Sequence, residues 1–153
     1  MLRENQYSDA LLIVNKLLKK HPFLTRLLIL KGRLIQLLDE ESELGELQDA
    51  LDALESAVKL DGESIDALNE LAIFRHVIEN KYDEAILLFE KSIAKCFQFL
   101  EEAYLGKAIC LFETDRIFES LNCLNEGLQV IPHAAKLKSE KDYILSIVQG
   151  TEK

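Results

Sequence analysis

The chain repeats a short pattern four times: a small residue is followed four positions later by a bulkier apolar residue, and then by a helix-ending turn. The four occurrences are Ala10/Val14 before Pro22, Ala50/Leu54 before Gly62, Ala85/Phe89 before Phe97 and Ser120/Leu124 before Pro132. Successive turns are therefore 40, 35 and 35 residues apart, close to the period of about 34 residues of helix-turn-helix arrays. Each unit of such an array buries its core against its neighbours and leaves an extended surface free, so the spacing predicts a repeat protein suited to binding another polypeptide.

Composition favours long helices over strands or disorder. Only 2 of the 153 residues are proline and 6 are glycine, while hydrophobic residues make up 48% of the chain. Alanine, leucine, glutamate and lysine, which are good helix formers, dominate the periodic stretches. A chain of this length is expected to form one domain that buries about 68–70% of its surface. We therefore predict a single all-α domain over residues 1–153.

Apolar residues recur at steps of three and four along eight stretches, which predicts eight helices. The expected helices span residues 5–20, 25–39, 47–60, 65–79, 82–95, 99–113, 117–130 and 132–148. The acidic stretch at 39–49 accounts for the one long spacing between turns and is interpreted as an insertion. Ser64 is expected to cap the fourth helix, and Gly62 to end the third in the left-handed conformation. The last helix has a charged outer side and is predicted to cap the array.

Charge and hydropathy narrow the class of partner and the compartment. The formal net charge of −9 opposes attraction to phosphate backbones, so we expect a protein or peptide partner and no nucleic acid. No run of 18 apolar residues lacks a charge, so no membrane insertion is expected. The first residues lack the basic and apolar regions of a secretory signal. Three cysteines, an odd number, suit a reducing compartment, and we expect a cytoplasmic protein.

No group of residues has the pattern of a catalytic or metal site. His21, His76 and His133 are scattered, without a second ligand at metal-binding spacing, and the acidic stretch lacks the spacing of a calcium loop. Cys110 and Cys123 lie in apolar windows that are typical of buried, inert thiols. Glycine-rich phosphate loops, nucleophile elbows and paired zinc-binding histidines are missing from the sequence. We therefore expect no enzymatic activity, no cofactor and no metal.

Several of these positions resemble the tetratricopeptide repeat. The matching segments are Gly32, Leu71-Ala72 and Leu105-Gly106 for the Leu-Gly pair of the first helix, Tyr82-Asp83-Glu84-Ala85 with Phe89 for the second helix, and Ala57 to Gly62 for the closing turn. The resemblance implies an α-solenoid of antiparallel helix pairs, forming a right-handed superhelix of about three and a half repeats. The implied units are a partial repeat at 1–24, a repeat with the acidic insertion at 25–64, repeats at 65–98 and 99–132, and a capping helix at 133–149.

The resemblance also implies a concave groove lined by the first helix of each unit. The implied lining residues are Arg26, Ile29, Arg33, Gln36, Asp66, Asn69, Ile73, His76, Leu100, Ala103, Tyr104, Lys107 and Cys110. Periodicity supports the first four independently, because they fall on one stripe of an otherwise apolar helix; the alternative is that these polar residues simply face solvent. Some family members clamp a terminal carboxylate with basic residues and asparagine. This chain has Ile29, Arg33, Leu100 and Tyr104 at those positions, so binding of acidic C-terminal motifs is disfavoured.

The leading hypothesis is a non-catalytic interaction module or adaptor that binds a peptide or helix in this groove, with Arg26, Arg33 and Lys107 setting its register. One alternative is a dedicated chaperone for a secreted or assembly-prone client, because small acidic arrays of three units resemble that group. Another is a structural oligomerisation unit. In that case the first helix, which lacks a predicted partner, presents Leu11, Val14 or Leu18 to a second copy and forms a homodimer.

Overall fold

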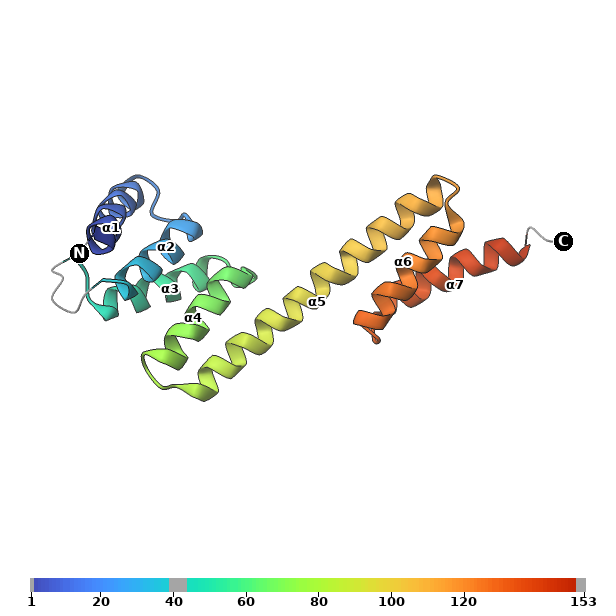
Figure 1. Cartoon of the computed structure of the whole chain (residues 1–153). Helices are drawn as coiled ribbons and strands as arrows, with labels where there is room; N and C mark the ends of the chain where they lie inside the picture. Colours follow the sequence, from blue (N-terminus) through green and yellow to red (C-terminus); the bar gives the residue numbers. More distant parts are fainter. Residues whose placement is uncertain (1, 39–43, 151–153) are drawn as a thin grey trace. The chain divides into compact units, whose positions relative to one another are not determined.

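The computed structural model describes residues 2–38 and 44–150, and all regular secondary structure in these ranges is helical. The helices are α1 (Leu2–Lys20), α2 (Thr25–Gln36), α3 (Leu47–Leu60), α4 (Ile65–Val77), α5 (Tyr82–Glu113), α6 (Ile117–Val130) and α7 (Ala135–Gly150). Figure 1 shows their order along the chain. The all-α class is confirmed. Residues 39–43 of the predicted acidic insertion lie outside the described residues.

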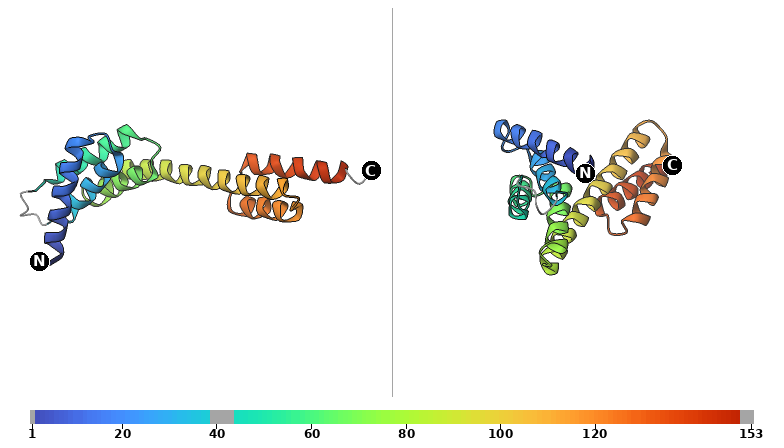
Figure 2. Two further views of the ribbon diagram at one scale, coloured as in Figure 1. Left: turned by 90° about the horizontal axis from the view of Figure 1, so that it is seen from above. Right: turned by 60° about the vertical axis from the view of Figure 1, so that its left-hand side comes forward.

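The chain divides into two compact units, Met1–Ile93 and Ala94–Lys153. In the first unit, α1 packs against α2, α2 against α3 and α3 against α4, and α2 also contacts α4 (Figure 1). In the second unit, α6 runs back along the C-terminal part of α5 and α7 packs against α6 (Figure 2). Stacked helix pairs are the architecture that the resemblance implies. The single-domain organisation and the repeat boundaries stay predictions.

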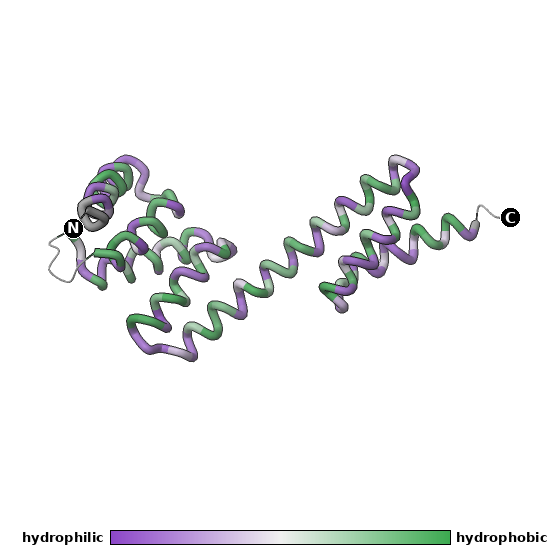
Figure 3. The backbone as a smooth tube through the Cα atoms, in the orientation of Figure 1, coloured by the Kyte–Doolittle hydropathy of each residue, from purple (hydrophilic) through white to green (hydrophobic). Residues whose placement is uncertain are grey.

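The core of the first unit is built from small residues on one helix facing large residues on the next. Hydrophobic and hydrophilic residues alternate along each helix (Figure 3), so each helix has one apolar side to bury. The buried cluster consists of Leu11, Val14, Leu34, Ile35, Ala50, Leu54, Leu71 and Phe74. Gly32 allows α2 to approach α3 closely, since a Cβ atom there would lie 2.6 Å from Cγ of Leu54. Leu11 and Val14 therefore belong to the core, and the prediction that they face a second copy is wrong.

Short-range hydrogen bonds define where helices begin and end. Ser64 caps α4 as predicted, because its Oγ accepts a hydrogen bond from the backbone N–H of Ala67 at 3.3 Å. The left-handed positions of the described chain are Asn80 (φ 57°) and Asp115 (φ 60°), which follow α4 and α5. No glycine among the described residues has a positive φ, so the prediction for Gly62 is wrong. Asp61 shapes that turn instead, with its Oδ1 accepting from the N–H of Glu63 at 3.2 Å.

The turn predicted at Phe97 is missing, and the expected helices 82–95 and 99–113 are one helix, α5. The physical reason is local: the segment Lys95-Cys96-Phe97-Gln98-Phe99 contains neither glycine nor proline. Nothing in that segment therefore removes a backbone donor or favours a left-handed residue. The repeat spacing predicted a turn that the local residue types do not require.

The second unit packs around the C-terminal part of α5. Its buried cluster consists of Ala108, Leu111, Cys123, Leu124, Ala134, Leu137 and Ile144. Ser120 is fully buried and its Oγ donates to the carbonyl oxygen of Ala108 at 2.7 Å. The small residue of α5 that meets α6 is thus Ala108. Gly106, the predicted counterpart, has nothing within 4 Å of where its Cβ would be, so the family match at Leu105-Gly106 is displaced by two positions.

Candidate partner-binding surfaces

An exposed stripe of alternating cations and leucines runs along α2. Arg26, Leu30, Arg33 and Leu37 follow one another at steps of four, three and four residues, and all four are exposed. Residues at this spacing share one face of a helix. Leu37, directly after α2, is 52% exposed. This stripe therefore offers both apolar contact and positive charge to a partner.

A second stripe runs along α4, which contacts α2. It consists of Asp66, Glu70, Ile73 and Val77, with Ile73 at 41% and Val77 at 58% exposure. The two stripes are joined by an ion pair between Arg33 Nη2 and Glu70 Oε1 at 2.6 Å. We call the two stripes together the α2–α4 surface.

Electrostatics hold the charges of the α2–α4 surface in place. The hydrogen bond that Arg33 donates to the carboxylate of Glu70 raises the pKa of the guanidinium. Partial burial opposes this rise and the negative charges of Glu70 and Asp66 add to it, so Arg33 stays cationic. Arg33, Gln36, Leu37 and Glu70 line a hollow of ≈ 300 Å³. Such a hollow can hold one side chain of a partner, flanked by a charged pair and by leucine.

Three of the residues predicted for the groove in this unit differ from expectation. Ile29 is only 5% exposed and packs with Ala57 and Ala67, so it belongs to the core. The exposed stripe shares Arg26 and Arg33 with the predicted one and has Leu30 and Leu37 in place of Ile29 and Gln36. Gln36 and Asn69 are partly buried at the edge, and the Gln36 amide donates to the carbonyl of Gly32 at 3.0 Å.

His76 is exposed, but its ring lies against Tyr82, with ring centroids 5.6 Å apart and an interplanar angle of 57°. It is therefore engaged with the start of α5. Sequence reasoning missed Leu30, Leu37 and Val77, although their spacing from Arg26 and Asp66 fits a helical stripe as well as the predicted sets do.

The predicted groove residues of the second unit separate into two groups. Leu100, Ala103, Lys107 and Cys110 are all exposed at helical spacing on α5, which agrees with a common face. Tyr104 instead packs against Gly127 of α6. The contact is close, since a Cβ atom added to Gly127 would lie 2.9 Å from Cγ of Tyr104. Lys107 also lines a hollow of ≈ 420 Å³ with Arg116, Glu119, Asn122 and Glu126 at the α6 side.

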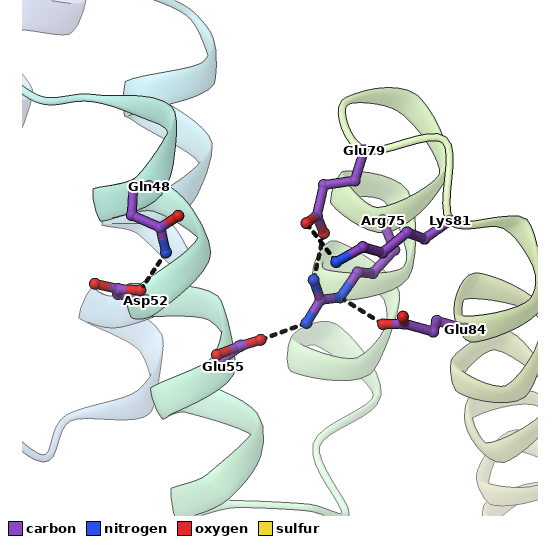
Figure 4. A network of polar contacts seen from close by, with 7 residues as sticks. All are labelled: Gln48, Asp52, Glu55, Arg75, Glu79, Lys81 and Glu84. Carbon is purple, nitrogen blue, oxygen red and sulfur yellow. Dashed lines mark hydrogen bonds and ion pairs between the residues drawn. The ribbon is translucent and has the colours of Figure 1, made fainter.

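A cluster of charges surrounds Arg75 at the junction of α3, α4 and α5 (Figure 4). Its guanidinium, 12% exposed, contacts the carboxylates of Glu55, Glu79 and Glu84, the last at 3.2 Å. Lys81 pairs with Glu79 at 2.8 Å. Burial opposes ionisation of Glu79, but the hydrogen bonds from Lys81 and Arg75 outweigh it and lower the pKa of this carboxyl. Every charge of the cluster has a partner, which makes it a structural clamp.

The cysteines of the second unit differ in their exposure. Cys123 is buried, and desolvation raises the pKa of its thiol. Cys110 is exposed rather than buried as its apolar sequence window predicts. Within residues 2–38 and 44–150, no three histidine, cysteine or acidic side chains gather in a way that could hold a metal ion. The helices described here include none that is long and apolar enough to cross a membrane.

No family model and no curated relative matches the chain. Among solved structures, the chain is similar to one titled "Crystal structure of MamA protein", with 18% sequence identity, 96% of this chain and 81% of that chain covered, and a TM-score of 0.49. Similarity at this level assigns neither a family nor a partner.

Proposed function

We propose that this chain is a non-catalytic protein-interaction module that binds a peptide or helix of a partner protein on the α2–α4 surface. The observation that carries the proposal is the combination of exposed Leu30, Leu37, Ile73 and Val77 with the Arg33–Glu70 pair, presented by two adjacent helices. A surface of this kind supplies apolar anchors for affinity and charges for orientation.

The apolar side chains are expected to contribute most of the affinity. Their methyl groups leave water when a partner binds, at roughly 25 cal/mol per Å² of buried apolar surface. The Arg33–Glu70 pair is half open to solvent on the arginine side. It is therefore expected to steer orientation and association rate more than affinity.

The test begins with a partner captured from cell extract and identified, whose binding to the purified chain is then measured by calorimetry. Leu37→Ser combined with Ile73→Ser is expected to weaken affinity at least tenfold, because both anchors of the surface are lost. The matched control is Leu47→Ser combined with Leu60→Ser, which changes two side chains of α3 with similar exposure, 48% and 45%. Equal affinity of both double variants would refute the α2–α4 surface as the binding site.

The contribution of charged side chains to partner binding is tested separately in the first and the second unit. Arg33→Glu should weaken binding severalfold. The exchange of Arg33→Glu with Glu70→Arg restores the ion pair but reverses the positions of the two charges that a partner contacts. Loss of binding in the exchanged variant, with an unchanged thermal transition, assigns the effect to recognition rather than folding. Lys107→Glu addresses the second unit on its own. If Arg33→Glu, the exchange and Lys107→Glu all bind like the native chain, charge plays no part in recognition.

A further inference from the structure

A second surface lies between α1 and α2, away from the residues of the α2–α4 surface. It is an open hollow of ≈ 730 Å³ lined by Leu12, Asn15, Lys16, Leu18 and Lys19 of α1 and by Lys31 of α2. Lys16 and Lys19 are one helical turn apart, and Leu12 precedes Lys16 by one turn, so the three share one face of α1. Figure 2 shows α1 lying across α2 in the first unit.

The charge of this hollow is opposite to that of the chain as a whole. The formal net charge is −9, yet among the described residues the hollow is lined by three lysines and by no carboxylate. Among the described side chains, Lys16, Lys19 and Lys31 take part in no ion pair, whereas Arg33, Arg75, Lys81 and Arg116 all do. An ammonium group has three hydrogen-bond donors and no acceptor, so the hollow presents unpaired donors and positive charge.

Apolar side chains border these lysines. Leu12, Ile13 and Leu17 of α1 are all exposed, with Ile13 at 60%. They contribute nothing to the core, which uses Leu11 and Val14 on the opposite side of the helix. Exposed apolar groups beside unpaired cations fit a ligand that carries both carboxylates and apolar side chains.

We propose that the α1–α2 hollow binds an acidic amphipathic segment of a partner protein, with carboxylates one helical turn apart meeting Lys16 and Lys19 and a third meeting Lys31. A second copy of this chain is the poorer occupant, because a two-fold symmetric contact sets the same patch against itself and would oppose lysine to lysine. Nucleic acid or an anionic membrane spreads negative charge over a wide surface and is repelled by the acidic remainder of the chain. The inference is independent of the α2–α4 surface.

The experiment uses the full chain and a fluorescent peptide that repeats the triplet Glu-Glu-Leu, followed by fluorescence anisotropy. Saturable binding that weakens as salt is raised is expected, because Lys16 and Lys19 are exposed and Lys31 is partly exposed. Lys16→Glu with Lys19→Glu and Lys31→Glu should reduce affinity at least tenfold. The matched control, Lys59→Glu with Lys91→Glu and Lys138→Glu, changes the net charge by the same amount on other helices and should retain at least a third of the affinity.

Additional variants and probes distinguish the acidic peptide from other ligands, and a loss of binding from a loss of folding. Lys16→Gln with Lys19→Gln and Lys31→Gln, a milder change, should reduce affinity severalfold with an unchanged thermal transition, and Leu12→Ser with Ile13→Ser should do the same. The proposal is overturned if the Lys16/Lys19/Lys31→Glu variant and the Lys59/Lys91/Lys138→Glu control lose affinity for the peptide equally. It is also overturned if the native chain does not bind the peptide at all. It is also overturned if phosphatidylserine vesicles bind through the three lysines while the peptide does not. A dimer that dissociates only in the Lys16/Lys19/Lys31 variants would assign the hollow to self-association instead and would likewise overturn it.

Discussion

At the scale of single residues, replacing a helical glycine by alanine is expected to have opposite effects on stability at two positions. Gly32 faces Leu54, whose Cγ would lie 2.6 Å from an added Cβ, whereas Gly106 has open space. Gly32→Ala is therefore expected to destabilise the fold by about 1–3 kcal/mol through overpacking. Gly106→Ala should stabilise it by roughly 0.5–1 kcal/mol, because alanine restricts the unfolded chain and favours the helix. Urea denaturation followed by circular dichroism measures both changes.

If Gly106→Ala is the destabilising member of this pair, Gly106 is a packing position and the register of α5 against α6 is wrong by two residues. The sequence pattern located the small residues that matter in the first unit, since Ala50 and Ala72 are fully buried and Ala85 is nearly so. The pattern failed at Gly106 because Ala108, another small residue, lies two positions further along α5. Either residue could be the small one that faces α6 as far as the sequence shows, and the contact between Ser120 and Ala108 in the structure identifies Ala108.

At the scale of helices, the Arg75 clamp predicts a pH dependence of stability. The pKa of Glu79 is below its ordinary value of 4.5 in the folded chain, so the unfolded chain binds more protons as pH falls toward and below that value. The stabilisation is therefore complete above about pH 4.5 and is lost as pH drops through the folded pKa. In Glu79→Gln this part of the acid-induced loss should be absent. Thermal unfolding between neutral and acidic pH measures it.

The control for this prediction is Glu90→Gln, which alters an exposed glutamate of α5 that forms no ion pair among the described residues. It should leave the pH dependence of the free energy of unfolding unchanged. A wild-type profile that matches Glu79→Gln throughout would show that the carboxylate of Glu79 gains nothing from Arg75 and Lys81 in the folded state.

Because α5 is continuous through Phe97, substitutions at this residue are expected to affect stability as they would in the middle of a helix. Phe97→Pro is expected to cost about 3 kcal/mol or more, because proline removes a backbone donor and clashes with the preceding turn. Phe97→Ala keeps the N–H group and removes an exposed ring, so a change within roughly 0.5 kcal/mol is expected. Chemical denaturation compares the two variants. Equal stability of both would mean that a turn occurs at Phe97, as the repeat spacing predicts.

Helix boundaries were predictable where local signals and periodicity agreed. The ranges 47–60 and 117–130 match α3 and α6, and Ser64 caps α4 through its side chain. The break near Phe97 was inferred from repeat spacing alone, without a local breaker, and it is the boundary that failed. Periodicity reports which side of a helix is apolar; where a helix ends depends on caps and breakers.

At the scale of the whole chain, the all-α class could be predicted from composition and periodicity, whereas the proposed binding surface could be predicted only in part. Arg26, Arg33, Asp66 and Ile73 were identified and are exposed on adjacent helices. Ile29 was assigned to the wrong side, because both Ile29 and Leu30 lie one helical turn from Arg26 and Arg33. Only the packing of Ile29 against Ala57 and Ala67 distinguishes the two. The unpaired lysines of the α1–α2 hollow are visible only when the helices are assembled.

The central claim is that partners bind on the α2–α4 surface, and the most direct test is chemical-shift mapping of the isotopically labelled chain during titration with a captured partner segment. We predict that the largest amide shifts fall in residues 26–37 and 66–77. The same titration with Leu37→Ser and Ile73→Ser should need at least tenfold more partner segment to reach the same shifts. Large shifts confined to α3, α6 or α7, with residues 26–37 and 66–77 unaffected, would contradict the claim.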